Sequence, residues 1–207
     1  MSNWLQFALL VSVLTMLPGI DTAQVLRSSI KGGPKLGYTT LFGIMLGVWA
    51  WGIATAVGLS AILLASSKVY TAIRYVGAAY LFYLGAKMIW AARSAPGLEI
   101  GSAQSSESSV KTMGRALMIT ITNPKNGAFY IAVLPQFVPH GMNPFIAGLI
   151  LSTIHNGLGL IWFSGIISLT RFAKDFFAKP RVTQVMEALS GTVLLGFGAR
   201  MLLEKSS

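Results

Sequence analysis

Six apolar runs, each long enough to cross a lipid bilayer, constrain this chain more than any other feature. They lie at about residues 4–27, 38–65, 70–92, 115–138, 144–170 and 183–203. A bilayer core about 30 Å thick needs about 20 helical residues, because a helix advances about 1.5 Å per residue. The composition agrees, since 54% of the residues are hydrophobic and only 11% are charged. The sequence therefore predicts an all-α integral membrane protein with six transmembrane helices.

The net charge of +10 does not indicate a nucleic-acid partner, because the basic residues stand in short groups between apolar runs and form no continuous basic face. The chain has no cysteine and only two histidines, so it lacks the ligand clusters of protein metal sites. It has neither an HExxH motif nor a glycine-rich phosphate-binding loop. We therefore expect no metal, no cofactor and no enzymatic activity.

The distribution of lysine and arginine predicts how the protein lies in membrane lipid. Of these sixteen residues, eleven lie at one set of helix ends and four at the other, while Lys125 lies inside an apolar run. Basic loops of membrane proteins remain mostly on the cytoplasmic side. Because six is an even number of spans, both termini are expected to be extracytoplasmic.

A polar stretch at residues 93–113, rich in serine, glycine and alanine, divides the chain into residues 1–92 and 114–207. Each half contains three apolar runs, of which the first is interrupted by a proline, Pro18 or Pro124, and followed by a short glycine and proline turn. A unit with an odd number of spans must lie inverted relative to its copy. We interpret residues 1–207 as one transmembrane domain of two inverted three-helix repeats, although two apolar segments can also resemble each other by chance. In transporters, broken helices at matching positions of such repeats form the binding site near the midplane.

Two charged residues accompany the two prolines. Lys125 follows Pro124 directly, and counting about 1.5 Å per residue from Arg115 places it roughly 15 Å deep, near the bilayer midplane. Asp21 comes three residues after Pro18, where a broken helix leaves backbone groups free. Charges inside the membrane are rare and are usually functional. We expect Lys125 to attract a carboxylate and Asp21 to bind an ammonium, an ion or a proton, although Asp21 could instead cap a helix or simply neutralise Lys125.

Three amide side chains lie beside these charges. Asn123 and Asn126 flank Lys125, and Gln24 lies one helical turn from Asp21. Amides inside a membrane usually satisfy backbone groups that a proline has freed. Each of the three is therefore a candidate either for that role or for contact with a substrate.

Two further ionisable residues lie inside apolar runs. His155 falls in the middle of the fifth run, where we favour a hydrogen-bonded packing role over a proton relay. Glu187 lies near the start of the sixth run, and we expect it to be structural, at the cytoplasmic interface or beside Arg181. Neither residue is expected to form the binding site.

Glycines recur in the second and sixth runs. Small residues let membrane helices approach closely, and we expect most of these glycines to serve packing within the bundle rather than a dimer seam. They are Gly43, Gly47, Gly52, Gly191, Gly196 and Gly198.

Two motifs together resemble those of a known family. The first is Leu17-Pro18-Gly19-Ile20-Asp21, followed by Gly32, Gly33 and Gly37, and the second runs from Thr122-Asn123-Pro124-Lys125 through Phe129 to Pro135-Gln136-Phe137. At this separation they resemble the LysE-type exporter superfamily, in particular its threonine/homoserine (RhtB-type) branch. The resemblance covers essentially the whole chain.

The resemblance implies a six-helix exporter of amino acids or their derivatives in the bacterial inner membrane, coupled to protons and forming homodimers. One departure is Ile20, because the family motif usually reads Pro-Gly-Pro-Asp. Isoleucine restores a backbone N–H there, so a less open break is expected. The motif residues that carry over are Pro18, Gly19, Asp21, Asn123, Pro124, Lys125, Pro135, Gln136 and Phe137.

We therefore expect a secondary active exporter of neutral, threonine- or homoserine-like amino acids, which rocks one repeat against the other around the two breaks. Within transport, the alternative is a cation exporter that uses Asp21, although Lys125 at the same depth would repel a bare metal ion. Outside transport, the alternative is a membrane scaffold subunit. A scaffold would tolerate neutral replacement of both charges.

Overall fold

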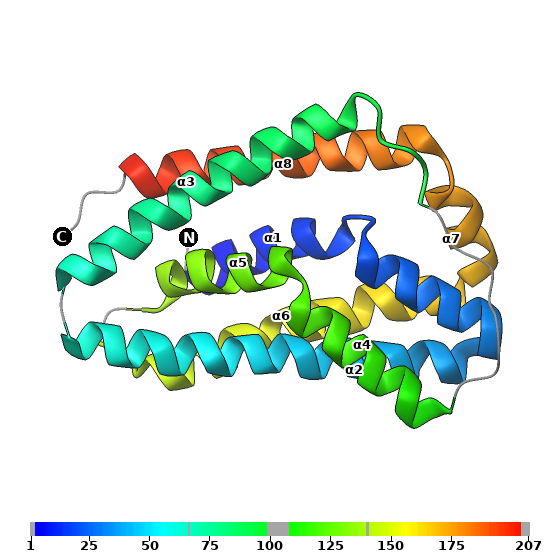
Figure 1. Cartoon of the computed structure of the whole chain (residues 1–207), viewed down its shortest axis with the longest axis horizontal. Helices are drawn as coiled ribbons and strands as arrows, with labels where there is room; N and C mark the ends of the chain where they lie inside the picture. The colour runs from blue at the N-terminus through cyan, green and yellow to red at the C-terminus, as the bar shows by residue number, and fades with distance from the viewer. Residues whose placement is uncertain (1–2, 66, 99–107, 140, 204–207) are drawn as a thin grey trace.

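The computed structural model describes residues 3–65, 67–98, 108–139 and 141–203, and every regular element in these ranges is a helix (Figure 1). In the described residues, three helices are long and apolar enough to cross a membrane, over Ile20–Gly58, Pro144–Ser168 and Pro180–Arg200. The prediction of an all-α protein is confirmed over these ranges. The helices are α1 Asn3–Met16, α2 Ile20–Ala65, α3 Ser67–Ala92, α4 Ser109–Thr122, α5 Pro124–Val133, the 3-10 helix η1 Leu134–Phe137, α6 Pro144–Ser168, α7 Thr170–Phe177 and α8 Pro180–Leu203.

The first predicted run contains a helix break. α1 ends at Met16 and α2 begins at Ile20, with Pro18 between them. Proline has no backbone N–H to donate, so the hydrogen-bond ladder of α1 stops there. α2 starts where the N–H of Ala23 donates to the carbonyl of Gly19 at 2.9 Å. The break therefore forms even though isoleucine replaces the family's second proline.

α2 bends sharply at a pair of glycines. Gly33 has a φ of 68°, a left-handed conformation that glycine adopts readily and other residues avoid. The hydroxyl of Thr40 donates to that of Ser28 at 2.7 Å, and Gly37 packs against Ser29, so the segments on either side of the bend lie together (Figure 1). The predicted glycine and proline turn between the first two runs is therefore present.

The fourth predicted run is broken as well, since α4 ends at Thr122 and α5 begins at Pro124. The predicted boundary of the polar loop at residue 113 is wrong. α4 already starts at Ser109, because the hydroxyl of Ser108 caps it by accepting from the N–H of Lys111 at 3.4 Å. Residues 99–107 of that loop lie outside the described residues.

Two helix pairs form the long sides of the bundle, α3 with α8 and α2 with α6 (Figure 1). Glycines allow the helices of both pairs to approach closely. A Cβ on Gly191 of α8 would lie 2.6 Å from the carbonyl oxygen of Gly85 of α3, and Gly52 of α2 packs directly against Ser152 of α6. The expected packing role of the glycines is confirmed except at Gly196, where an added Cβ would have no neighbouring atom of another segment within 4 Å. Gly43, Gly47 and Gly198 also contact neighbouring helices.

α7 is a short amphipathic helix that the hydrophobic pattern does not predict. Ala173 and Phe177 are buried, while Phe172 is exposed on the opposite face. The carbonyl of Phe177 accepts from the N–H of Leu98 at 2.8 Å. α7 therefore links the end of α6 to the chain that follows α3, at the same end of the bundle as the bend of α2 (Figure 1).

Candidate functional site

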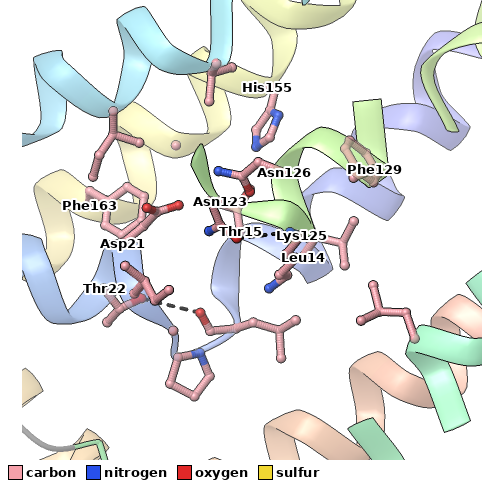
Figure 2. A pocket seen from close by; sticks show the side chains of 18 of the residues that line it. Leu14, Thr15, Asp21, Thr22, Asn123, Lys125, Asn126, Phe129, His155 and Phe163 are labelled. Atoms are coloured by element: carbon pink, nitrogen blue, oxygen red, sulfur yellow. Dashed lines mark hydrogen bonds between the residues drawn. The ribbon is translucent and has the colours of Figure 1, made fainter. Parts of the chain in front are cut away.

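The two helix breaks meet at a cavity inside the bundle (Figure 2). The cavity encloses about 280 Å³, and its lining includes Pro18, Gly19 and Asp21 from the first break and Asn123 and Lys125 from the second. Pockets for small molecules usually measure about 300–1,000 Å³. The volume therefore suits one small solute.

Asp21 lies in the first turn of α2, with its carboxylate directed toward the amides of Asn123 and Asn126 (Figure 2). The N-terminus of a helix carries a partial positive charge that stabilises a carboxylate. Gln24 donates from Nε2 to Oδ1 of Asp21 at 3.5 Å but does not line the cavity. Gln24 therefore orients Asp21, while Asp21 itself faces the cavity.

Two side chains stabilise the second break. Asn123 caps α5, since its Oδ1 accepts from the N–H of Lys125 at 3.0 Å. Pro124 cannot donate to the carbonyl of Thr120, four residues earlier. The indole N–H of Trp51 on α2 donates to that carbonyl at 3.3 Å instead. A neighbouring helix thus satisfies the backbone group that the proline leaves unpaired, a role for Trp51 that no sequence motif indicates.

Lys125, the second residue of α5, extends into the cavity between two acids. It interacts electrostatically with Asp21 of α2 and with Glu187 of α8. Its ammonium therefore shares the cavity with two carboxylates. The location expected for Glu187 is corrected, because it lines the cavity together with Asp21 and Lys125.

Asn126 presents an unpaired amide to the same region. Its Nδ2 is buried and has no hydrogen-bond partner. A buried donor without an acceptor costs about 1–3 kcal/mol. Asn126 lines the cavity, so an acceptor on a bound solute would satisfy this group.

His155 of α6 belongs to both the cavity wall and the packed core. Its ring stacks on that of Tyr130 of α5, with centroids 5.8 Å apart and planes at 12°. The hydroxyl of Tyr130 lies 2.8 Å from Nδ1 of His155, and Tyr130 is fully buried. His155 therefore has the hydrogen-bonded packing contact that we favoured, and it also lines the cavity.

The last motif, Pro135-Gln136-Phe137, lies outside the cavity, in η1. Phe137 packs against Phe7 of α1 and Phe197 of α8, at centroid distances of 5.4 and 6.2 Å. Pro135 is buried, and Nε2 of Gln136 is buried without a hydrogen-bond partner. This motif therefore closes the bundle beyond the end of α5 rather than contributing to the cavity wall.

The remainder of the cavity wall is largely apolar. Its polar groups are mostly engaged: the hydroxyl of Thr15 donates to Val11 at 2.7 Å, and the amide of Asn156 donates to the carbonyl of Met45 at 3.1 Å. No group of three or more histidine, aspartate or glutamate side chains that could hold a metal occurs in the described ranges. The apolar lining residues are Leu14, Leu17, Ile20, Leu41, Ile44, Met45, Val48, Leu81, Leu84, Met88, Phe129, Phe163 and Leu194.

The sequence has relatives along nearly its whole length. The membrane protein YrhP of Bacillus subtilis (strain 168), described as uncharacterized, is 29% identical over 97% of this chain and 98% of its own. The leucine efflux protein of Enterobacter sp. (strain 638) is 28% identical over 91% of this chain and 89% of its own. The leucine efflux protein of Klebsiella pneumoniae is 27% identical over 96% and 94%. No solved structure matches the chain.

The sequence model of the LysE type translocator family matches residues 12–205. That range includes both helix breaks and every residue that lines the cavity. The resemblance that the two motifs carry is confirmed, and the chain belongs to the LysE type translocator family of membrane transporters.

Proposed function

We propose that this protein exports neutral amino acids with apolar side chains, in exchange for protons, through the cavity between the two helix breaks. The observation that carries the proposal is the presence of Asp21 and Lys125, one from each helix break, in the lining of a single cavity. An amino acid carries an ammonium and a carboxylate on one carbon. Asp21 binds the ammonium, and Lys125 binds the carboxylate.

The substrate carboxylate gains two further interactions. The N-terminus of α5 is directed at the cavity, and its partial positive charge favours an anion there. The Nδ2 of Asn126, which also neighbours the carboxylate of Asp21, is a further donor within the same wall. These groups make the α5 end of the cavity the carboxylate end and the α2 end, with Asp21, the ammonium end.

The wall of the cavity favours an apolar substrate side chain over the threonine- or homoserine-like chain that the family resemblance suggests. Most of the lining is aliphatic or aromatic, and the hydroxyls of Thr15 and Thr22 donate to carbonyls of Val11 and Leu17. A substrate hydroxyl would therefore find few free partners, which disfavours its burial. The leucine efflux proteins among the relatives support the same choice by their names.

Two inverted repeats account for the way in which the helices pair. α1 with the start of α2 corresponds to α4 with α5, the long segment of α2 to α6, and α3 to α8. Under this exchange the pairs α2 with α6 and α3 with α8 each map onto themselves, and the contacts of α1 with α6 become those of α4 with α2. Alternating access is then a rocking of one repeat, residues 1–92, against the other, which starts with α4 at Ser109, with the segment between them as the connection.

The orientation in the bacterial inner membrane follows from the same scheme. The bend of α2, the start of α4 and α7 lie at one end of the bundle, as expected for the basic cytoplasmic side (Figure 1). The start of α1 and the end of α8 lie toward the other end (Figure 1), which supports extracytoplasmic termini. Homodimer formation stays a prediction.

The test is efflux of labelled amino acids from preloaded proteoliposomes, with and without a pH gradient. We expect leucine-like substrates to leave faster when protons can enter in exchange, and we expect Asp21→Asn and Lys125→Ala to abolish this flux. Asp175→Asn and Lys111→Ala are matched controls, because both residues are exposed outside the cavity. These two variants should transport like the wild type.

A different result would change the assignment. If Asp21→Asn and Lys125→Ala transport normally, the two-charge site is wrong. If the wild type moves no amino acid while all variants fold equally well, the scaffold alternative is favoured. If a metal cation moves instead, the cation-exporter alternative replaces the proposal.

A further inference from the structure

The cavity contains one carboxylate more than an amino acid requires. Asp21 and Glu187 both line it, and Lys125 is the one lysine or arginine among the described lining residues. A zwitterion uses one carboxylate and one ammonium of the protein, which the proposed function assigns to Asp21 and Lys125. Glu187 is therefore an ionisable group in the cavity that substrate binding does not engage directly.

The surroundings of the two carboxylates differ. Asp21 has the N-terminus of α2, the amide of Gln24 and the electrostatic attraction of Lys125. Glu187 lies inside α8, where the helix uses its own backbone N–H groups, and its electrostatic partner in the cavity is Lys125. Burial of a charge is unfavourable unless other charges or donors compensate it. Asp21 is the more deeply buried of the two, whereas Glu187 is half-buried and has fewer compensating groups around it.

An exchange of one proton for one zwitterion needs a group that is protonated in the empty cavity and ionised when the substrate is present. The incoming ammonium supplies the positive charge that makes a second ionised carboxylate tolerable. A carboxylate that faces the substrate space without being the ammonium's own ligand can release its proton while the substrate stays bound. Glu187 meets both requirements.

We propose that Glu187 is the proton-carrying residue of this exporter, an inference that rests on the proposed function. In the empty, outward-open protein the Glu187 carboxylate takes up a proton from outside. In the inward-open protein the arriving substrate ammonium displaces that proton, which leaves to the cytoplasm. One proton then enters for each amino acid that leaves, and the two are never carried together.

Other titratable groups face the same space and must be separated from Glu187 by the experiment. α1, which also packs against α8, contains no titratable side chain. α7, which also packs against α8, carries its charged residues on exposed positions. The groups in the cavity lining are Asp21 of α2, Tyr80 of α3, Lys125 of α5 and His155 of α6.

The experiment measures proton release on substrate binding to the purified full-length protein in detergent. Leucine is titrated in weakly buffered solution with a pH indicator, and the binding heat is measured separately by calorimetry. We expect the wild type to release a proton on binding. Glu187→Gln should bind leucine without releasing one, while Glu187→Asp should restore the release. Asp175→Asn, which neutralises an exposed carboxylate of α7, is the matched control and should behave like the wild type.

Each other result decides against a specific claim. If Glu187→Gln still releases a proton on binding, another group carries it and the inference is wrong. If Glu187→Gln no longer binds leucine although it unfolds at the wild-type temperature, Glu187 is a substrate ligand, which also overturns the inference. If the wild type binds leucine without proton release, the amino-acid site stands and the proton-carrier assignment fails. If the wild type binds no amino acid of the panel, the proposed function itself fails.

Discussion

The contact between α3 and α8 should be sensitive to a single added methyl group. A Cβ on Gly191 would lie 2.6 Å from the carbonyl oxygen of Gly85 and 2.7 Å from Cγ1 of Ile89. Ordinary contacts begin at 3.4 Å, so the shortest of these must lengthen by about 0.8 Å. The isoleucine side chain can rotate away, but the carbonyl oxygen belongs to the backbone of α3. The two helices must therefore separate, and overpacking of this kind costs about 1–3 kcal/mol.

Gly196→Ala is the matched control, because Gly196 lies in the same helix with nothing within 4 Å of its Cβ position. Alanine favours a helix over glycine by up to about 1 kcal/mol, so this variant should be as stable as the wild type or slightly more stable. Gly191→Ala raises the helix propensity of α8 by the same amount, but it also disrupts the close packing of α8 against α3. The free energy of unfolding of the two variants should therefore differ by about 1–3 kcal/mol.

Equilibrium unfolding in mixed detergent micelles, followed by circular dichroism, measures this difference. Since α3 and α8 both line the cavity, Gly191→Ala should also reduce leucine flux in proteoliposomes. Equal stability of the two alanine variants would refute the close approach of α3 and α8.

Three further predictions concern single hydrogen bonds. Tyr130→Phe removes the 2.8 Å hydrogen bond to His155 and should lower the free energy of unfolding by about 0.6 kcal/mol, and by at most about 1.7 kcal/mol. Tyr83→Phe changes an exposed tyrosine and should leave the free energy of unfolding unchanged in the same assay. Trp51→Phe leaves the carbonyl of Thr120 unpaired, so it should cost about 1–3 kcal/mol and impair leucine efflux; unchanged efflux and stability would show that the indole does not support the break. Asn156→Ala removes the 3.1 Å bond between α6 and α2 and should lower the unfolding free energy by about 1 kcal/mol, which a thermal melt in detergent would detect.

Several elements can be predicted from local sequence alone. Pro18 and Pro124 lack a backbone N–H, so each must interrupt a helix wherever the chain folds. Gly33 allows the bend of α2 for a similarly local reason. The length and apolar character of the runs predict helices, because unpaired backbone groups are too unfavourable in lipid. Helix boundaries that depend on a cap, such as the start of α4 at Ser109, cannot be predicted in this way, because the hydrophobic pattern carries no information about capping.

Depth in the membrane also follows from sequence, which is why the positions of Asp21 and Lys125 along their apolar runs predict that they lie at one level. Their depth does not say that they share a cavity, because residues at one level can face lipid, a neighbouring helix or a pocket. Gln24 illustrates the difference: it lies one turn from Asp21, yet it orients that carboxylate from outside the cavity lining.

Only the tertiary structure decided which distant residues join the two breaks. Trp51 reaches the carbonyl that Pro124 leaves free, and Glu187 enters the cavity from the last helix. Both outcomes depend on the rotation of a helix about its axis and on which helices are neighbours. Those features are set by packing of side chains and glycines across interfaces, which the local hydrophobic pattern does not encode. The chain sequence thus determines the helices, their breaks and the depth of the charges, and the packed bundle determines which of these groups can act together.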